Sequence, residues 1–468
     1  MSGIGDRRGC GAVGRLGSLG AGLTLFAAGV AAQESPLARF IHETRLDNGL
    51  DVIVVENHAV PLATVLVAVR NGAFTQDSAE QGLAHLYEHL LFHSYRGGPD
   101  AFAIEVTRLN GRYNGTTSHE VVYYYVTVPS KNAERGLKLV AQLVAEARFS
   151  NGDLKDERPV VLDELQRGES DPEEQFVRHV SRMLWGASWS RKDVGGDSTS
   201  LAGIRLDRLK QTYARYYVPN NAALIVTGDV ASERVLEQAR DVFKDWKPGP
   251  DPFADLPIPP IAPRTASTAV ILAHDVRDVT IRIALQGPSV GRDAAATYAA
   301  DALFDVLNDP ASAFQQRLVE LGPFQSLSGY YVTLDHTGPI EIVGKTTPER
   351  AQDALLMLLD ELESLDALEG VGDEDLAIAK KHREVSMALT LEQTSVLAPE
   401  LAGWWSSAGL DYYLGYHAHM ATQTLDDLRR FARSYIVGRP RVIGVLAPPT
   451  TTQQIAAWLR EGVKRAAP

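Results

Sequence analysis

The pattern of apolar and polar positions divides the 468-residue chain into two similar successions of elements. Short apolar runs rich in β-branched residues, at 50–57 and 62–70, predict strands, and the 3.6-residue apolar period of 82–94 predicts a helix after them. In the second half, predicted strands at 267–275 and 279–287 again precede a helical pattern, and each half ends with a helix followed by a β run. The chain is therefore predicted to contain a duplicated α+β unit of about 200 residues.

A proline-rich segment separates the two successions. Seven prolines fall between Pro248 and Pro263, a density that excludes helix and central strand and favours a stiff, extended linker. We expect an α+β fold of two homologous domains, at 33–247 and 265–468, joined by a linker at 248–264. Each domain is expected to be a mostly antiparallel sheet packed with helices.

The first 32 residues have the pattern of a secretory signal peptide. Three arginines precede the apolar run "LGAGLTLFAAGVAA", which ends in small residues at Ala31 and Ala32. We expect cleavage after Ala32, with retention as an anchor as the alternative, and no stable membrane insertion of the mature chain. The only cysteine, Cys10, lies inside this segment, so the mature protein is expected to be a disulfide-free periplasmic protein.

The charge and the lack of cysteine narrow the classes of ligand. A formal net charge of −13 argues against nucleic acid and anionic membrane surfaces as partners. The negative charge either mildly favours a basic ligand or only keeps the protein soluble. A thiolate metal site is excluded, which leaves His, Asp and Glu as candidate ligands.

The helix predicted at 82–94 has the sequence "GLAHLYEHLLFHS" and carries the clearest candidate chemistry. His85, Glu88 and His89 occupy positions i, i+3 and i+4, which share one helix face. Two imidazoles one turn apart can bind a single zinc ion, and the carboxylate between them is placed to take a proton from the water that the zinc activates. The H-x-x-E-H order inverts the commoner H-E-x-x-H order and carries the same chemistry. The alternative is the polar face of an amphipathic helix.

A catalytic zinc usually needs a third protein ligand. The segment 154–174 is predicted to be helical and places Glu157 and Glu164 two turns apart on one face, so either can complete the site. His93 and His119 are competing ligands. The corresponding helix of the second half carries no such cluster and has in its place Ala299, Ala300, Leu303 and Phe304. Only the first half is therefore expected to hold a metal.

With these residues the chain resembles the pitrilysin/insulinase family of zinc metallopeptidases, the inverzincins. It is most similar to the shorter two-domain branch that contains mitochondrial processing peptidases and their bacterial relatives. Matching stretches include "RLDNGLDVIVVEN", "GLAHLYEHLLF", "ERPVVLDEL" and "YYVPNNAALIVTGDV". The resemblance implies one zinc ion held by His85, His89 and Glu164, with Glu88 as general base and Glu157 as a supporting carboxylate.

The resemblance also implies where a substrate binds. The stretch "NGRYNGTTS" around Asn114 matches the family's active-site edge strand, to which an extended peptide adds as a further strand. Taken alone, its two Asn-Gly pairs are only turn signals.

One departure from the family concerns the Arg and Tyr that the second half of self-sufficient members supplies. Gln325 stands where the Tyr is expected, and Arg317 lies one residue out of register. Tyr330 and Tyr331 follow and are expected to begin a strand. The resemblance therefore implies a heterodimer with an inactive homologous subunit that supplies the Arg/Tyr pair, the two chains enclosing a chamber for peptides and small unfolded chains.

Three functional hypotheses follow. The leading one is an exported zinc endopeptidase that hydrolyses extended peptides. The alternative is a non-catalytic homologue with a structural or peptide-binding role. A third, metal binding without hydrolysis, uses the same ligands but does not need Glu88.

Overall fold

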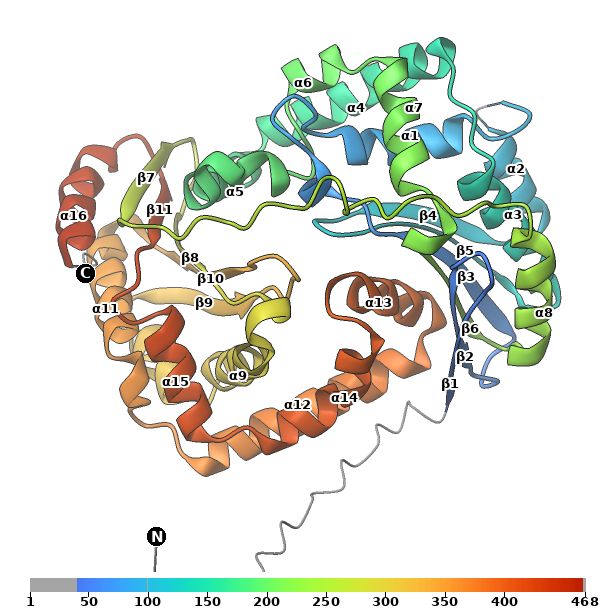
Figure 1. The fold of residues 1–468 in the computed structure, drawn as a ribbon. Coiled ribbons are helices and arrows are strands. Elements are labelled where there is room, and N and C mark those ends of the chain that lie inside the picture. Colours follow the sequence, from blue (N-terminus) through green and yellow to red (C-terminus); the bar gives the residue numbers. More distant parts are fainter. Residues whose placement is uncertain (1–39, 99, 466–468) are drawn as a thin grey trace, which may run out of the picture. The chain divides into compact units, whose positions relative to one another are not determined.

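A computed structural model describes residues 40–98 and 100–465, and the signal peptide expected at 1–32 lies outside the described residues. Among the described residues, no helix combines the length and the apolar character that a bilayer crossing needs. Two sheets packed with helices form the fold, which confirms the expected α+β class (Figure 1).

The first sheet contains six strands and is mostly antiparallel. In spatial order they are β1 (Ile41–Arg45), β2 (Asp51–Glu56), β6 (Ala222–Gly228), β3 (Leu62–Val69), β5 (Val122–Pro129) and β4 (Arg112–Thr117). Only the pair β2 and β6 is parallel. In β5 every second residue is buried, as the alternating sequence of a half-covered strand predicts. β4 lies at the edge of the sheet.

The second sheet repeats this arrangement with five strands. Its order is β7 (Thr268–Ala273), β11 (Val442–Ala447), β8 (Val279–Gln286), β10 (Pro339–Thr346) and β9 (Phe324–Tyr331). The pair β7 and β11 is parallel, as β2 and β6 are, and the other pairs are antiparallel. The duplication expected from the sequence is therefore a duplication of topology.

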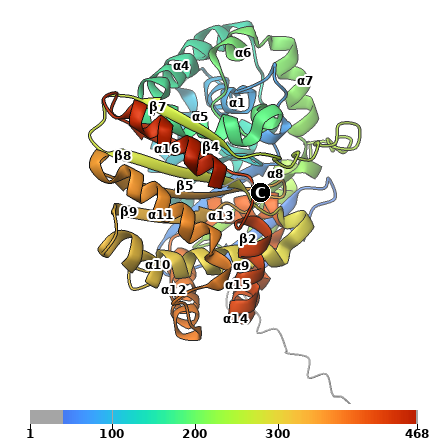
Figure 2. The same cartoon turned by 90° about the vertical axis from the view of Figure 1, so that its left-hand side faces the viewer.

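Helices of each half cover one face of its own sheet with an apolar core. In the first half these are α1 (Leu83–His93), α2 (Ala101–Arg108), α3 (Ala133–Ala145), α4 (Asn151–Ser170), α6 (Ser198–Gly203), α7 (Leu206–Tyr216) and α8 (Ser232–Phe243). In the second half they are α9 (Val290–Asn308), α10 (Ala313–Gln315), α11 (Ala351–Glu363), α12 (Asp373–Glu392), α14 (Leu410–Thr422), α15 (Leu425–Tyr435) and α16 (Thr452–Arg465). Figure 2 shows α11 and α16 over the second sheet.

One helix of each half also packs on the sheet of the other half, against the face opposite that sheet's own helices (Figure 1). α13 (Thr394–Ser407) packs its buried Leu401 and Trp405 against strands β3 and β6 of the first sheet. In return α5 (Pro172–Trp185) packs Phe176 and Val180 against β8 and β11 of the second sheet. Since apolar burial contributes roughly 25 cal/mol per Å², each sheet depends on the other half of the chain for part of its stability.

The proline-rich segment was expected to exclude helix and central strand, and residues 246–267 form neither helix nor strand. Phe253 within it packs against the first core and Ile261 against the contact between α5 and the second sheet. The division into domains at this segment stays a prediction, since the exchanged helices α5 and α13 cross it.

One local prediction was confirmed only in part, and another was wrong. The helix expected over 154–174 breaks at Asp171, whose carboxylate accepts hydrogen bonds from the backbone N–H groups of Glu173 and Glu174 and so starts α5. Tyr330 and Tyr331 end β9 rather than begin a strand, because that strand starts directly after Pro323.

Candidate metal centre

Helix α1 presents the three residues of the H-x-x-E-H motif on one side. It begins after Gly82, whose φ of 85° is a conformation that glycine adopts without strain. Leu86 and Leu90 are fully buried against the first core, whereas His85, Glu88 and His89 remain partly exposed. The apolar spacing that forms the helix therefore also determines which side chains stay available for chemistry.

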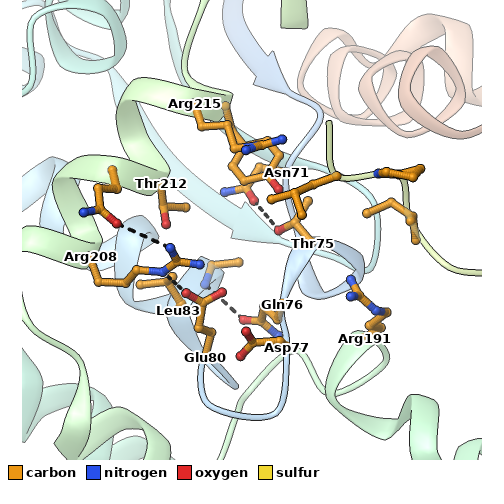
Figure 3. A pocket seen from close by; sticks show the side chains of 16 residues that line it. Asn71, Thr75, Gln76, Asp77, Glu80, Leu83, Arg191, Arg208, Thr212 and Arg215 are labelled. Carbon is orange, nitrogen blue, oxygen red and sulfur yellow. Dashed lines mark hydrogen bonds and ion pairs between the residues drawn. The ribbon is translucent and has the colours of Figure 1, made fainter. Parts of the chain in front are cut away.

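The start of α1 is held by the segment that precedes it, next to a cavity of about 280 Å³ (Figure 3). Gln76 Oε1 accepts a hydrogen bond from the backbone N–H of Ala84, and the backbone carbonyl of Glu80 accepts one from Leu83. The Glu80 side chain is paired with Arg208 of α7. These contacts satisfy two of the N–H groups that a helix start leaves free and so hold the turn that carries His85.

Helix α4 packs against α1 and completes a cluster of possible metal ligands. Its start has a capping box in which Ser150 and Asp153 exchange hydrogen bonds between side chain and backbone. Glu164 Oε2 lies 3.3 Å from His89 Nε2 and 3.9 Å from His85 Nε2. One ligand atom from each of these three residues lies within 4.8 Å of the others.

This donor set fits zinc. Ligands bound at about 2.0–2.1 Å to a tetrahedral ion are about 3.4 Å apart, close to the 3.3 and 3.9 Å found here. Two imidazoles and one carboxylate, with a fourth position left for water, are a usual donor set of catalytic zinc. The structure thus brings His85 and His89 to Glu164, one of the two acidic residues that the spacing along the chain left open.

Glu157 lies on the far side of His89. Its Oε2 is 3.4 Å from His89 Nδ1 and its Oε1 is 2.9 Å from His93 Nδ1. Glu157 therefore contacts a candidate ligand without belonging to the cluster, as a supporting carboxylate does. His93, a competing ligand by sequence, is likewise outside the cluster.

The electrostatic environment differs between the two histidines. Burial and the neighbouring His89 lower the pKa of His85, which favours the neutral imidazole that binds metals. Burial also acts to lower the pKa of His89, but the contact with Glu157 and the charge of Glu164 outweigh it, so the pKa of His89 is raised. The pKa of Glu157 is lowered, mainly by its contact with His89.

Glu88 is directed toward the edge strand β4. Thr117 of that strand donates a hydrogen bond of 2.8 Å from its Oγ1 to Glu88 Oε2. Gly115 leaves room for this approach, since a Cβ atom at that position would lie 2.8 Å from Glu88 Cγ. Asn114 is exposed on the same strand, and among the described residues this strand pairs only with β5. The other side of β4 is thus the side on which a further strand can add.

Other sequence candidates lie elsewhere. His119 is in the turn between β4 and β5, where burial and the charge of Lys192 lower its pKa to about 4. Arg317 is held by Glu361 through two hydrogen bonds of 2.6 and 2.7 Å, and Gln325 is exposed on β9.

A cavity of about 440 Å³ adjoins the cluster and includes a residue that sequence reasoning missed. His85 and Glu164 line it together with Arg282 of β8, a strand of the second half. Arg282 is 9% exposed and paired with Glu341, and its Nε has no hydrogen-bond partner within the part of the chain that the structure describes. The sequence signal for Arg282 was a charged residue within the apolar run "VTIRIALQ". Such residues are rarely buried without a partner.

Comparisons with known proteins identify related families and relatives. Residues 51–195 match the family described as insulinase (peptidase family M16), and residues 203–382 match the peptidase M16 inactive domain. An "uncharacterized zinc protease" of Streptomyces coelicolor is 24% identical over 423 residues, covering 87% of this chain and 90% of its own. The probable mitochondrial-processing peptidase subunit beta of Arabidopsis thaliana is 22% identical over 415 residues, covering 86% of this chain and 78% of its own.

Solved structures share the fold. A protease from Helicobacter pylori superposes with a TM-score of 0.77 at 21% identity, covering 87% of this chain and 99% of its own. A peptidase M16 inactive domain from Pseudomonas fluorescens gives 0.74 at 18% identity, covering 87% and 98%. The two family matches lie on either side of residues 196–202 and together span more than half of the chain, with the metal cluster inside the first. The chain belongs to the insulinase-type M16 peptidase family.

Proposed function

We propose that this protein is an exported zinc-dependent endopeptidase that hydrolyses extended peptides and small unfolded chains. The observation that carries the proposal is the convergence of His85, His89 and Glu164 beside a fourth residue, Glu88, that can move a proton. Relatives named zinc proteases support the same reading.

The residues of the chain have separate roles in this proposal. Bound zinc would supply a Lewis acid that lowers the pKa of water and polarises the scissile carbonyl. Glu88 accepts a proton from the attacking water and returns it to the leaving nitrogen, as the new C–O bond forms and the C–N bond breaks. Thr117 orients Glu88 through its hydrogen bond. Strand β4, around Asn114, binds the peptide backbone as an added strand.

We further propose that the chain works with a homologous, inactive subunit that supplies an Arg/Tyr pair. Arg317 is engaged by Glu361, and Gln325 stands in place of the expected Tyr. A relative named as a subunit of mitochondrial-processing peptidase supports an assembly of this kind. The proposal is overturned if the purified lone chain is as active as it is with a homologous subunit added.

The periplasm is the proposed location, on the basis of the basic and apolar pattern of residues 1–32. Fractionation of cells followed by N-terminal sequencing tests it. A mature chain beginning at Gln33 in the periplasmic fraction is the expected result, and a cytoplasmic full-length chain contradicts it.

The central test separates metal binding from catalysis. Wild-type protein is expected to contain one zinc ion per chain and to cleave unstructured peptides in the presence of its partner. E88Q is expected to keep the zinc and lose cleavage by at least about 100-fold, because it removes the general base. Unchanged cleavage by E88Q contradicts the proposed mechanism.

A non-catalytic, peptide-binding role is the second candidate, favoured by the absence of an Arg or Tyr at the expected positions of the second half. It predicts that wild-type protein binds extended peptides but cleaves none of them, with or without a homologous subunit.

A further inference from the structure

His93 is the last residue of α1 and is oriented by α4. Its side chain is 10% exposed, and its Nδ1 lies 2.9 Å from Glu157 Oε1. Its Nε2 lies 3.9 Å from a carboxylate oxygen of Asp153 and 3.9 Å from one of Asp156. Both nitrogens of His93 are thus directed at the first two turns of α4.

Glu157 connects His93 to the metal cluster. While Oε1 contacts His93, Oε2 lies 3.4 Å from Nδ1 of His89, whose Nε2 lies 3.3 Å from Glu164. One carboxylate therefore contacts two imidazoles that are one helical turn apart, and the Glu157 side chain is only 17% exposed.

This arrangement has a physical consequence for His89. An imidazole that binds a metal through one nitrogen keeps a proton on the other, and a carboxylate that accepts a hydrogen bond from this N–H sets the tautomer and the ring orientation. A glutamate with one such contact can still rotate about its terminal torsion. The second contact, from His93, holds the other oxygen and removes that freedom.

We propose that His93 is a positioning residue, which acts through Glu157 to orient His89 and so increases the affinity of the cluster for zinc. The inference rests on the proposed function, because it assumes that the cluster binds zinc. It assigns a role to a histidine that is not a ligand and lies one helical turn beyond the H-x-x-E-H motif.

A purely structural role is the competing explanation. A histidine in the last turn of a helix can stabilise that helix through the helix dipole, without any effect on a metal site. Such a role changes the stability of the metal-free protein and leaves zinc affinity unchanged, so the two explanations predict different results.

The experiment is a double-mutant cycle read out as the zinc dissociation constant, measured by competition with a chelator at neutral pH. H93A is expected to weaken zinc binding by about 10-fold and E157A by about 10- to 100-fold, the range for residues that support a metal ligand. The double variant H93A/E157A is expected to match E157A, because His93 acts through Glu157.

Two further variants serve as controls. H93N is expected to retain most of the affinity, because its amide N–H takes the place of the imidazole Nδ1–H. H179A changes an exposed histidine of α5 whose Nδ1 lies 2.7 Å from the Gln175 carbonyl oxygen, and this variant is expected to bind zinc as the wild type does. Thermal unfolding of the metal-free variants measures any loss of stability separately.

The outcomes distinguish this inference from the proposed function. Wild-type protein that binds no zinc overturns both. If the wild type binds zinc and H93A binds it equally tightly, the role of His93 is overturned and the proposed function stands. The same conclusion follows if the effects of H93A and E157A on zinc affinity simply add.

Discussion

The helix pair α1 and α4 of the first half and the helix pair α9 and α12 of the second occupy equivalent places in the duplicated fold. In each half a glycine of the edge strand lies against the first helix of the pair. Gly115 lies against Glu88 and Phe92. Gly329 lies against the Phe304 ring, and its backbone exchanges two hydrogen bonds with the side chain of Asn308.

Matching these contacts places Asp301 and Asp305 where the first half has His85 and His89. The same matching places Phe304 at the position of Glu88, whereas Ala299, Ala300 and Leu303 are buried in the second core. Arg383 of α12 donates two hydrogen bonds of 2.5 Å to Asp305, and the Tyr416 hydroxyl donates one of 2.5 Å to Asp301.

The difference shows how one helix pair gives two kinds of cation site. In the first half, imidazoles and a carboxylate converge on a place that suits a metal ion. In the second, two carboxylates converge near a guanidinium that the chain itself supplies. In the second site the guanidinium of Arg383 supplies the positive charge that the carboxylates need.

The first test removes one residue from each of the two cation sites and measures zinc binding and stability. H89A removes one of three ligands and is expected to weaken zinc binding on the order of 1,000-fold, because each ligand contributes a large share of the binding free energy. R383A is expected to leave zinc binding unchanged and to lower the free energy of unfolding by about 2 kcal/mol, since it leaves two carboxylates without their counter-ion.

Chelator competition measures the first quantity and urea unfolding the second. Loss of zinc binding in R383A contradicts the assignment of the two sites to separate functions.

The exchanged helices provide a second comparison. Trp405 of α13 is 3% exposed, and its Nε1 donates a hydrogen bond of 2.9 Å to Asp51 of the first sheet. W405A is expected to lower the free energy of unfolding by about 3–5 kcal/mol, and F176A on the reciprocal helix α5 by a similar amount. Because each helix packs on the other half's sheet, both variants are expected to unfold in one cooperative transition. Two separate transitions in calorimetry disprove the mutual dependence of the halves.

Substitution of the two edge-strand glycines, Gly115 and Gly329, tests the difference between the two helix pairs. G115A places a Cβ 2.8 Å from Glu88 Cγ, so Glu88 has to move and cleavage is expected to fall by about 100-fold, with zinc still bound. G329A places a Cβ 2.6 Å from the Phe304 ring and is expected to cost about 1–3 kcal/mol of stability without affecting catalysis directly.

Measurement of kcat, zinc content and urea unfolding on both variants separates these effects. Equal losses of kcat at equal stability contradict the distinction between the proposed catalytic site and the second site.

A further expected effect is a pH dependence of stability. Burial raises the pKa of Asp301 from its ordinary 3.8 to about 6. The native state therefore binds this proton more tightly than the unfolded chain, and the stabilisation is complete below about pH 4 and lost as the pH rises through about 6. This contribution is expected to be about 2–3 kcal/mol.

D301N removes the titrating group. The free energy of unfolding of wild type relative to D301N is expected to fall between pH 4 and pH 7.5 in urea titrations. A constant difference between the two proteins across this range contradicts the raised pKa.

Much of the fold could be predicted from the sequence, because strand alternation and helical periodicity are local. The runs at 50–57, 62–70, 267–275 and 279–287 became β2, β3, β7 and β8, and the motif helix became α1. The exchange of α5 and α13 could not be predicted, because an apolar helix face indicates burial but not the sheet against which it is buried.

The sequence by itself determined that His85, Glu88 and His89 share one helix face, since the 3.6-residue repeat of an α-helix places positions i, i+3 and i+4 together. It also determined that the second half lacks these residues. Only the tertiary structure decided that Glu164 meets His89 Nε2 while Glu157 meets Nδ1, and that His93 contacts Glu157 rather than the cluster. The physical reason is that contacts between two helices depend on their relative offset and rotation, which packing against the shared core determines and periodicity along either helix does not.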